Sequence, residues 1–260
     1  MEAIQLQSGL WSYFKKKFGD TGNFIRFSAR FFRYLFKRPF EGNELLIQCF
    51  KCGYQSLPLV GITAFIMGLV MTIQSRPSLV TFGAESLLPG IVSFTIIKEV
   101  GPVITALVCA GKISSRMGAE LGSMRVTEQI DAMEVSGINP YKFLVISRTL
   151  ATTLMVPILS IFADAIALFS SFIAANVHGD FTFQRFIRLA LSRLDFIDII
   201  PALIKSVFFG FIIGMIGCYK GYQTSEGTAG VGKAANSAVV AASLTIFVID
   251  LITVQITDLF

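Results

Sequence analysis

Five ionisable residues stand within stretches of the sequence that are otherwise strongly apolar: Lys98, Glu99, Asp164, Lys205 and Asp250. Apolar stretches of such length are typical of helices that cross a membrane. A charge at the centre of a bilayer costs roughly 2.5 to 3.5 kcal/mol or more, so it normally faces an opposite charge or water. The pattern therefore indicates either ion pairs that hold helices together or polar groups that line a transport path, and the residues alone leave both readings open.

Helix geometry predicts which of these charges meet. At about 1.5 Å of rise per residue, Lys205 and Asp250 each lie about eight residues from the outer end of their stretch, at a common depth of roughly 12 Å. We expect them to pair, directly or through water, because either alone would be a costly unpaired ion. Glu99 lies somewhat deeper and is expected to compete for the same lysine.

Residues that could carry enzyme or metal chemistry are sparse. Cys49 and Cys52 form a single C-x-x-C pair, and the one histidine, His178, is far away in the sequence. A tetrahedral zinc site is therefore not completed within one chain. The histidine lacks a nearby nucleophile motif and a cluster with metal-ligand spacing. We expect no catalytic residue, no metal site and no cofactor in this chain.

The segment 227–233 satisfies G-x-x-x-x-G-K, the first part of a phosphate-binding loop. Position 234 is alanine, so the hydroxyl that would bind Mg²⁺ is missing. The segment also lies between two apolar stretches instead of between a strand and its helix. We interpret it as a chance match and expect ATP hydrolysis to come from a separate chain.

Long apolar helices must position these residues. The chain has 260 residues, is 53% hydrophobic and 15% charged, and has a mean hydropathy of +0.68, values that are typical of a membrane protein. We predict one integral domain, residues 54–260, with five spans at about 54–75, 87–112, 147–174, 197–219 and 236–258. Gly210, Gly214 and Gly217 fall on one face of the fourth span, where they either allow close helix packing or have no special role.

Residues 1–53 form a basic N-terminal region. Its first 40 residues hold eight Lys or Arg against two acids, interleaved with aromatic residues. Spacings of three and four place the apolar side chains on one stripe, which predicts an amphipathic helix at the membrane interface, against anionic headgroups. A helix packed on a protein partner is the alternative. The net charge of +5 is mostly a property of this region, and we expect no nucleic-acid partner.

An odd number of spans places the two termini on opposite sides of the membrane. With a cytoplasmic N-terminus, about 16 Lys and Arg fall in cytoplasmic segments and about 4 in outer loops, as the positive-inside rule requires. Arg185, Arg188 and Arg193 are the exception, because their loop is then external.

Residues 115–136, between the second and third spans, are predicted to form one amphipathic helix that ends at Gly137. Val126, Ile130 and Met133 recur at helical spacing. The other face carries charges: Arg125, Glu128, Asp131 and Glu134. The segment is too polar to span, so we expect it to lie across the membrane surface and dock on a soluble partner. A solvated loop helix is the plainer alternative.

The run 120–134, Glu-Leu-Gly-Ser-Met-Arg-Val-Thr-Glu-Gln-Ile-Asp-Ala-Met-Glu, resembles the signature of the MlaE/YrbE permease family of Mla and Mce lipid transporters. Further segments that resemble the family are 98–102, 110–112, 203–207 and 228–232, with an aspartate at Asp250. The resemblance extends over nearly the whole chain, while the first 40 residues match only in character.

This resemblance implies a homodimeric, all-α integral membrane protein with an N-terminal amphipathic interfacial helix, five transmembrane helices and a cytoplasmic coupling helix at about 115–136. The coupling helix would seat on an ABC ATPase subunit, which binds ATP and Mg²⁺. The residues expected at this contact are Glu120, Arg125, Glu128, Gln129, Asp131 and Glu134. An MCE-domain periplasmic lipid-binding protein is a further implied partner, and a small cytoplasmic regulatory subunit is left open.

The implied function is transport of phospholipid between membranes, from the bacterial inner membrane, with the N-terminus cytoplasmic and the C-terminus periplasmic. A plastid version of the complex is also compatible with the sequence. The resemblance places Lys98, Glu99, Lys205 and Asp250 near a lipid cavity at the dimer centre. We also expect an apolar lipid route at the outer end of the first two spans, formed by Met71, Gln74, Leu79 and Phe82.

Two other classes of function compete with lipid transport by an ABC complex. A secondary transporter would use the buried carboxylates to couple transport to an ion gradient, but five spans do not divide into two equal inverted repeats. A membrane scaffold that transports nothing is the third possibility. Copurification of an ATPase would discriminate against both.

Overall fold

The computed structural model of the chain describes residues 22–35, 41–178, 181–194, 196–225 and 227–257. Within these ranges the chain is helical and contains no strand. Five helical stretches are long and apolar enough to cross a membrane: Gly42–Thr81, Glu85–Val126, Tyr141–Ala175, Ile199–Tyr222 and Gly227–Thr257. The prediction of an all-α membrane protein with five spans is confirmed.

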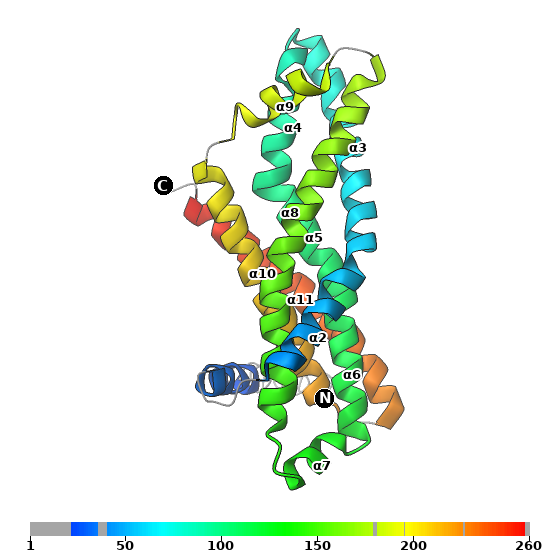
Figure 1. Ribbon diagram of the computed structural model, residues 1–260, viewed down its shortest axis with the longest axis vertical. Coiled ribbons are helices and arrows are strands. Elements are labelled where there is room, and N and C mark those ends of the chain that lie inside the picture. Colours follow the sequence, from blue (N-terminus) through cyan, green and yellow to red (C-terminus); the bar gives the residue numbers. More distant parts are fainter. Residues whose placement is uncertain (1–21, 36–40, 179–180, 195, 226, 258–260) are drawn as a thin grey trace, which may run out of the picture.

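The helices form one elongated bundle (Figure 1). After a helix over residues 22–35, they are α2 (Gly42–Cys52), α3 (Leu57–Thr81), α4 (Leu88–Thr95), α5 (Gly101–Cys109), α6 (Ser115–Val126), α7 (Gln129–Val135), α8 (Ser147–Ala175), α9 (Phe183–Leu191), α10 (Phe196–Tyr222) and α11 (Gly227–Thr257). The long helix α8 contacts α2, α3, α5 and α10. In Figure 1, α4 and α9 lie near one end of the bundle and α7 lies at the other, while the upper ends of α10 and α11 lie below those of α3 and α8.

The helix over residues 22–35 lies across the long axis of the bundle (Figure 1). Phe27 and Phe31 are buried, whereas Ile25 and Phe32 are 62% and 53% exposed. The Tyr141 hydroxyl at the start of the third span donates a hydrogen bond to the Phe27 carbonyl. One side of this helix is thus fixed to the bundle and another is apolar and open, which fits the interfacial position that the sequence predicts. The predicted stripe before residue 22 lies outside the described residues.

The segment 115–136 differs from the prediction of one helix lying across the membrane surface. Its first part is α6, which continues the second span and buries Met117 and Leu121 against neighbouring helices. The helix then breaks at Glu128, whose φ of 57° is left-handed, and α7 begins at Gln129. The apolar side of α6 is held by packing inside the bundle, so only α7 is free to project from its end.

Close helix packing around α10 depends on its glycines. A Cβ on Gly210 would lie 2.5 Å from the carbonyl oxygen of Thr152, and one on Gly214 would lie 2.8 Å from Cα of Thr149. At Gly221 a Cβ would come within 2.7 Å of the Leu121 Cβ. The glycine face therefore allows α10 to pack directly on α8 and α6, as small residues do in membrane bundles.

The three arginines of the predicted outer loop belong mainly to a short amphipathic helix. Within α9, Phe186 and Ala190 are buried, and Ser93 Oγ of α4 donates a hydrogen bond of 2.7 Å to the Ala190 carbonyl. Arg185 and Arg188 lie on its exposed face. This end of the bundle is therefore closed by a helix whose outer face is basic.

Candidate functional site

A π-helical turn over Ile96–Val100 places Lys98 and Glu99 in the middle of the second span. Pro102 has no N–H and cannot donate to the preceding turn, and the Gly101 N–H bonds the Ile96 carbonyl five residues back. A π turn inserts one extra residue into a helix and is frequent at functional sites. The local sequence thus changes the direction in which the two charged side chains leave the helix.

Lys205 of α10 joins two carboxylates from other spans. Its Nζ lies 2.6 Å from Glu99 Oε2 and 2.8 Å from Asp250 Oδ1 of α11. The predicted pairing of Lys205 with Asp250 is confirmed, and so is the approach of Glu99 to the same lysine. We call Glu99, Lys205 and Asp250 the intramembrane triad.

The exposure of the triad is uneven. The Lys205 side chain is 3% exposed, whereas those of Glu99 and Asp250 are 35% and 21% exposed. Carboxylates that are open at membrane depth are expensive to place against hydrocarbon. The open side of the triad must therefore face water or a further protein surface.

A cavity of about 290 Å³ lies beside the second span, lined by Ile91, Phe94, Thr95 and Arg193. Lys98 Nζ lies 5.0 Å from the centroid of the Phe94 ring, one helical turn away. The cavity thus combines apolar walls with two nearby cations. It lies on the same span as the triad residue Glu99, towards the α9 end of the bundle.

The predicted lipid-route residues at the end of α3 do not line this cavity. Met71 and Leu79 are partly buried and pack against the hydrophobic core. Phe82 is 83% exposed, and Gln74 is exposed as well. The structure therefore places them on two different faces, and their contact with lipid stays a prediction.

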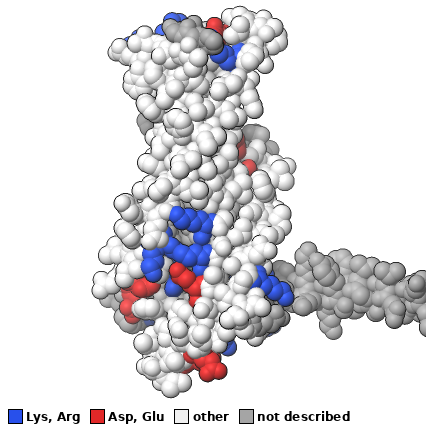
Figure 2. All heavy atoms as spheres, turned by 90° about the vertical axis from the view of Figure 1, so that its right-hand side faces the viewer, with Lys and Arg blue, Asp and Glu red and all other residues white. Residues whose placement is uncertain are grey.

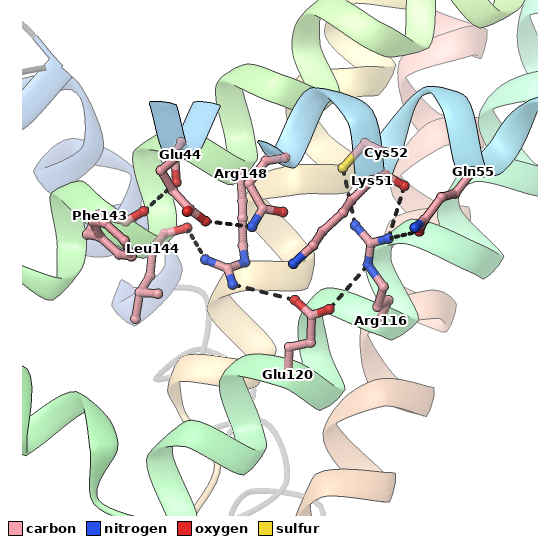
Figure 3. Close-up of polar contacts among 11 residues, drawn as sticks. Glu44, Lys51, Cys52, Gln55, Arg116, Glu120, Phe143, Leu144 and Arg148 are labelled. Atoms are coloured by element: carbon pink, nitrogen blue, oxygen red, sulfur yellow. Dashed lines mark hydrogen bonds and ion pairs between the residues drawn. The ribbon is translucent and has the colours of Figure 1, made fainter. Parts of the chain in front are cut away.

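A second polar cluster joins α2, α6 and α8 nearer the α7 end (Figure 3). Glu120 of α6 lies between two arginines, with its Oε1 3.4 Å from Arg116 Nε and its Oε2 3.4 Å from Arg148 Nη2 of α8. Arg116 Nη1 also donates to the Lys51 carbonyl at 3.0 Å and to Gln55 Oε1 at 3.1 Å. We call Arg116, Glu120 and Arg148 the arginine–glutamate bridge.

The bridge ties the start of the first span to the second and third spans. The Arg148 side chain is only 6% exposed, so its charge depends on Glu120 and on the Leu144 carbonyl, which accepts a hydrogen bond of 3.2 Å from Nη1. On the face seen in Figure 2, Lys, Arg, Asp and Glu gather over the lower part of the molecule, with a few more at the upper end and a band between the two that is almost free of charge. This charged zone is suited to the edge of a membrane.

Residues predicted to contact an ATPase separate into two groups. Glu120 is engaged in the bridge, inside the bundle, whereas Glu128, Gln129, Asp131 and Glu134 are exposed on or beside α7. Arg125 at the end of α6 forms an ion pair with Asp131, which links α6 to α7 across the break. Val135, at the end of α7, is 90% exposed. The projecting element is therefore charged on its sides and apolar at its tip.

The described residues contain no group of three or more His, Cys, Asp or Glu side chains that could hold a metal ion. The four cysteines are free thiols. The segment 227–233 forms the first two turns of α11. It therefore does not have the strand–loop–helix geometry of a nucleotide site.

Two arginines of these sites were not predicted as site residues: Arg148, and Arg193, which the sequence places only in an outer loop. Arg148 stands at the start of an apolar span, and an arginine at that position was a signal for a buried partner. The spacing of Arg116 and Glu120, four residues apart, was visible as a helical ion pair. The contact of Glu120 with Arg148, 28 residues further along the chain, depends on the tertiary structure.

Known proteins are similar to this chain over most of its length. The family model "Permease MlaE" matches residues 45–256. A probable ABC transporter permease protein of Rickettsia prowazekii is 35% identical over 241 residues, which is 93% of this chain and 92% of that protein. A probable ABC transporter permease protein of Synechocystis is 34% identical over 227 residues, 85% of this chain and 84% of that protein.

A plant protein is also similar. Protein TRIGALACTOSYLDIACYLGLYCEROL 1, chloroplastic, of Arabidopsis thaliana is 32% identical over 218 residues, which is 84% of this chain and 62% of that protein. The range matched by the family model contains the intramembrane triad, the arginine–glutamate bridge and α7.

Replacing Lys205 tests the triad. Lys205→Met should leave two carboxylates without their cation and lower the stability of the membrane domain by about 3–5 kcal/mol, the usual cost of breaking a buried pair. Combining it with Glu99→Gln and Asp250→Asn should restore most of the loss. Thermal unfolding in detergent, followed with a thiol-reactive dye that reports exposure of the buried Cys109 and Cys218, measures both. A single variant that melts like the parent would contradict the expected dependence on the pair.

Proposed function

This chain belongs to the MlaE permease family, and we propose that, as the permease subunit of an ABC transporter, it moves phospholipid between membranes with energy from a separate ATPase subunit. The single observation that carries the proposal is the intramembrane triad, in which a buried lysine holds two partly open carboxylates at membrane depth. A simple anchor has no need of such a group, whereas a transport path does.

The triad supports assembly of two copies around a watery cavity. Glu99 and Asp250 would be covered by water in a central cavity, which avoids their contact with hydrocarbon. The last span is the least enclosed of the five, since only 17% of its most apolar stretch of 18 residues is buried within one chain. Leu244, Phe247 and Leu251 of α11 are 63%, 52% and 61% exposed. A homodimer through this region would enclose both triads.

Phospholipid fits the cavity beside the second span. Ile91 and Phe94 offer apolar contact to an acyl chain, while Arg193 and Lys98 supply cations for a phosphate. The name of the plant relative refers to trigalactosyldiacylglycerol, a lipid, and this supports lipid as the class of substrate. Lys98, Glu99, Lys205 and Asp250 would then face the lipid or its surrounding water.

Coupling to ATP hydrolysis would pass through α7. In this proposal the ATPase subunit, which holds ATP and Mg²⁺, contacts Glu128, Gln129, Asp131 and Glu134 together with the apolar tip at Val135. A displacement of α7 reaches α6 through the Arg125–Asp131 pair. The arginine–glutamate bridge then carries it to α2 and α8, so the spans move as rigid bodies.

The remaining parts of the proposal concern location and partners. The α7 end, with the basic residues around it, would be cytoplasmic, which follows the positive-inside rule. The C-terminus and α9 would then be periplasmic, in a bacterial inner membrane. An MCE-domain protein at the α9 end would receive or deliver lipid, and a small cytoplasmic regulatory subunit would be an additional partner.

Charge reversal on α7 tests the contact with the ATPase. Glu128→Lys combined with Asp131→Lys should reduce retention of the ATPase subunit on the purified permease by on the order of tenfold or more, because a partner surface that complements these two acids would then face like charges. The exposed Arg125–Asp131 pair contributes at most about 1 kcal/mol to stability, so the membrane domain should stay folded. The matched control is Ser78→Lys with Thr81→Lys, two exposed positions at the other end of the bundle. Equal retention in both double variants would count against the contact.

Photo-crosslinking tests the lipid cavity. A photoreactive amino acid at Ile91 or Phe94 should capture phospholipid from proteoliposomes several times more often than one at Ile158, a 54% exposed position on the face of α8. The same probe at Leu79 and Phe82 tests the lipid route predicted from the sequence. If labelling at Ile91 and Phe94 is no higher than at Ile158, the cavity is ordinary membrane-facing surface.

A further inference from the structure

A cavity of about 530 Å³ lies between the helix of residues 22–35, the connection from α7 to α8 and the end of α10. Its lining includes two arginines and three tyrosines: Arg30, Arg33, Tyr34, Tyr141 and Tyr222. The transport proposal gives none of these five residues a role. Guanidinium and aromatic side chains together offer charge-assisted hydrogen bonds and stacking surfaces to a ligand.

The two guanidinium groups are available for an anion. Both Arg30 and Arg33 are exposed, and among the described residues no carboxylate lies within ion-pair distance of either. Arg30 Cζ lies 5.8 Å from the centre of the Tyr141 ring, which orients the guanidinium along the cavity wall. A planar guanidinium presents parallel N–H donors that match two oxygens of a phosphate.

The wall behind these arginines is fixed in place. The Tyr141 hydroxyl is bonded to the Phe27 carbonyl, and the Tyr141 ring contacts the Phe27 ring edge-on at 5.0 Å. Asn139 Oδ1 accepts hydrogen bonds of 3.1 and 3.3 Å from the N–H groups of Tyr141 and Lys142. These bonds fix the Asn139 side chain, which is part of the cavity lining. The site is therefore largely formed before any ligand binds.

The surroundings of the cavity favour a lipid over a soluble molecule as the carrier of the anion. Phe32 and Ile25 on the same helix are open apolar side chains, and Phe32 directly precedes Arg33. On a helix, these apolar residues lie roughly a third of a turn from the arginine face. A lipid whose acyl chains pack along Phe32 would therefore bring its headgroup to the mouth of the cavity, where the anionic surface of a cytoplasmic leaflet is also found.

We propose that this cavity binds the phosphate of a phospholipid headgroup from the leaflet on the α7 side of the membrane. The phosphate lies between Arg30 and Arg33, and the rest of the headgroup extends towards Asn139 and Tyr222. Glu134, also in the lining, limits how much additional negative charge the site accepts. A bound headgroup connects the interfacial helix to the α7–α8 connection. This binding is separate from transport, because it concerns a different cavity and needs no ATPase.

The experiment measures ligand binding to the full-length chain in detergent by native mass spectrometry and by thermal shift. The probes are dioctanoyl phosphatidylglycerol, dioctanoylglycerol, glycerol phosphate and inorganic phosphate. The test variant is Arg30→Gln with Arg33→Gln, and the control is Arg26→Gln, an exposed arginine of the same helix that does not line the cavity.

Phosphatidylglycerol should bind the parent chain and raise its unfolding temperature, and dioctanoylglycerol, which lacks the phosphate, should not. The double variant should bind phosphatidylglycerol about tenfold to a hundredfold more weakly, since each lost charge-assisted hydrogen bond accounts for roughly tenfold. The Arg26→Gln variant should stay close to the parent. Equal stabilisation by glycerol phosphate or inorganic phosphate would overturn the assignment to a lipid and make the cavity a site for a soluble phosphate.

Two further results would overturn the proposal. One is unchanged binding of phosphatidylglycerol by the double variant, which would place the lipid elsewhere. The other is a cross-link from position 33 to a carboxylate of the copurified ATPase subunit that excess phosphatidylglycerol does not reduce, which would make the cavity a protein contact.

Discussion

The attraction of Lys205 to Glu99 and Asp250 is the interaction on which the rest of the structure depends. A charged lysine that is 3% exposed at membrane depth is costly unless opposite charges lie beside it. Its two partners come from the second and fifth spans, so the triad fixes the fourth span between them. The π turn at Ile96–Val100 and the slant of α10 and α11 in Figure 1 are consistent with this geometric requirement.

Close helix packing at other positions makes the bundle around the triad rigid. Gly210 and Gly214 allow α10 to approach α8 closely, and Gly221 does the same towards α6. Further along the bundle, Arg148 of α8 and Arg116 of α6 share Glu120. The triad joins the second span to the fourth and fifth, and the arginine–glutamate bridge joins it to the first and third, so the second span is held at two levels. A rotation of α6 that is driven from α7 would have to move both levels together, which is how a packed bundle transmits a discrete change.

The five spans and the pairing of Lys205 could be predicted because hydrophobicity and helical rise are properties of the local sequence. The shape of the 115–136 segment could not, because α6 is retained in the bundle by burial of Met117 and Leu121, a tertiary effect. The lipid-route residues illustrate a related limit, since Met71 and Phe82 are close in sequence but differ in exposure. Arg148 and Arg193 were missed because their partners and cavity come from distant segments.

The most direct test of the central claim is phospholipid movement by the purified complex in proteoliposomes. Fluorescent phospholipid and an acceptor for it would be supplied, and either ATP with Mg²⁺ or an imposed proton or sodium gradient would be the only source of energy. We expect movement that requires ATP and an ATPase subunit copurified with this chain, and no movement with the gradient alone. Transport that follows the ion gradient in the absence of ATP would contradict it and would assign the buried carboxylates to a secondary transporter.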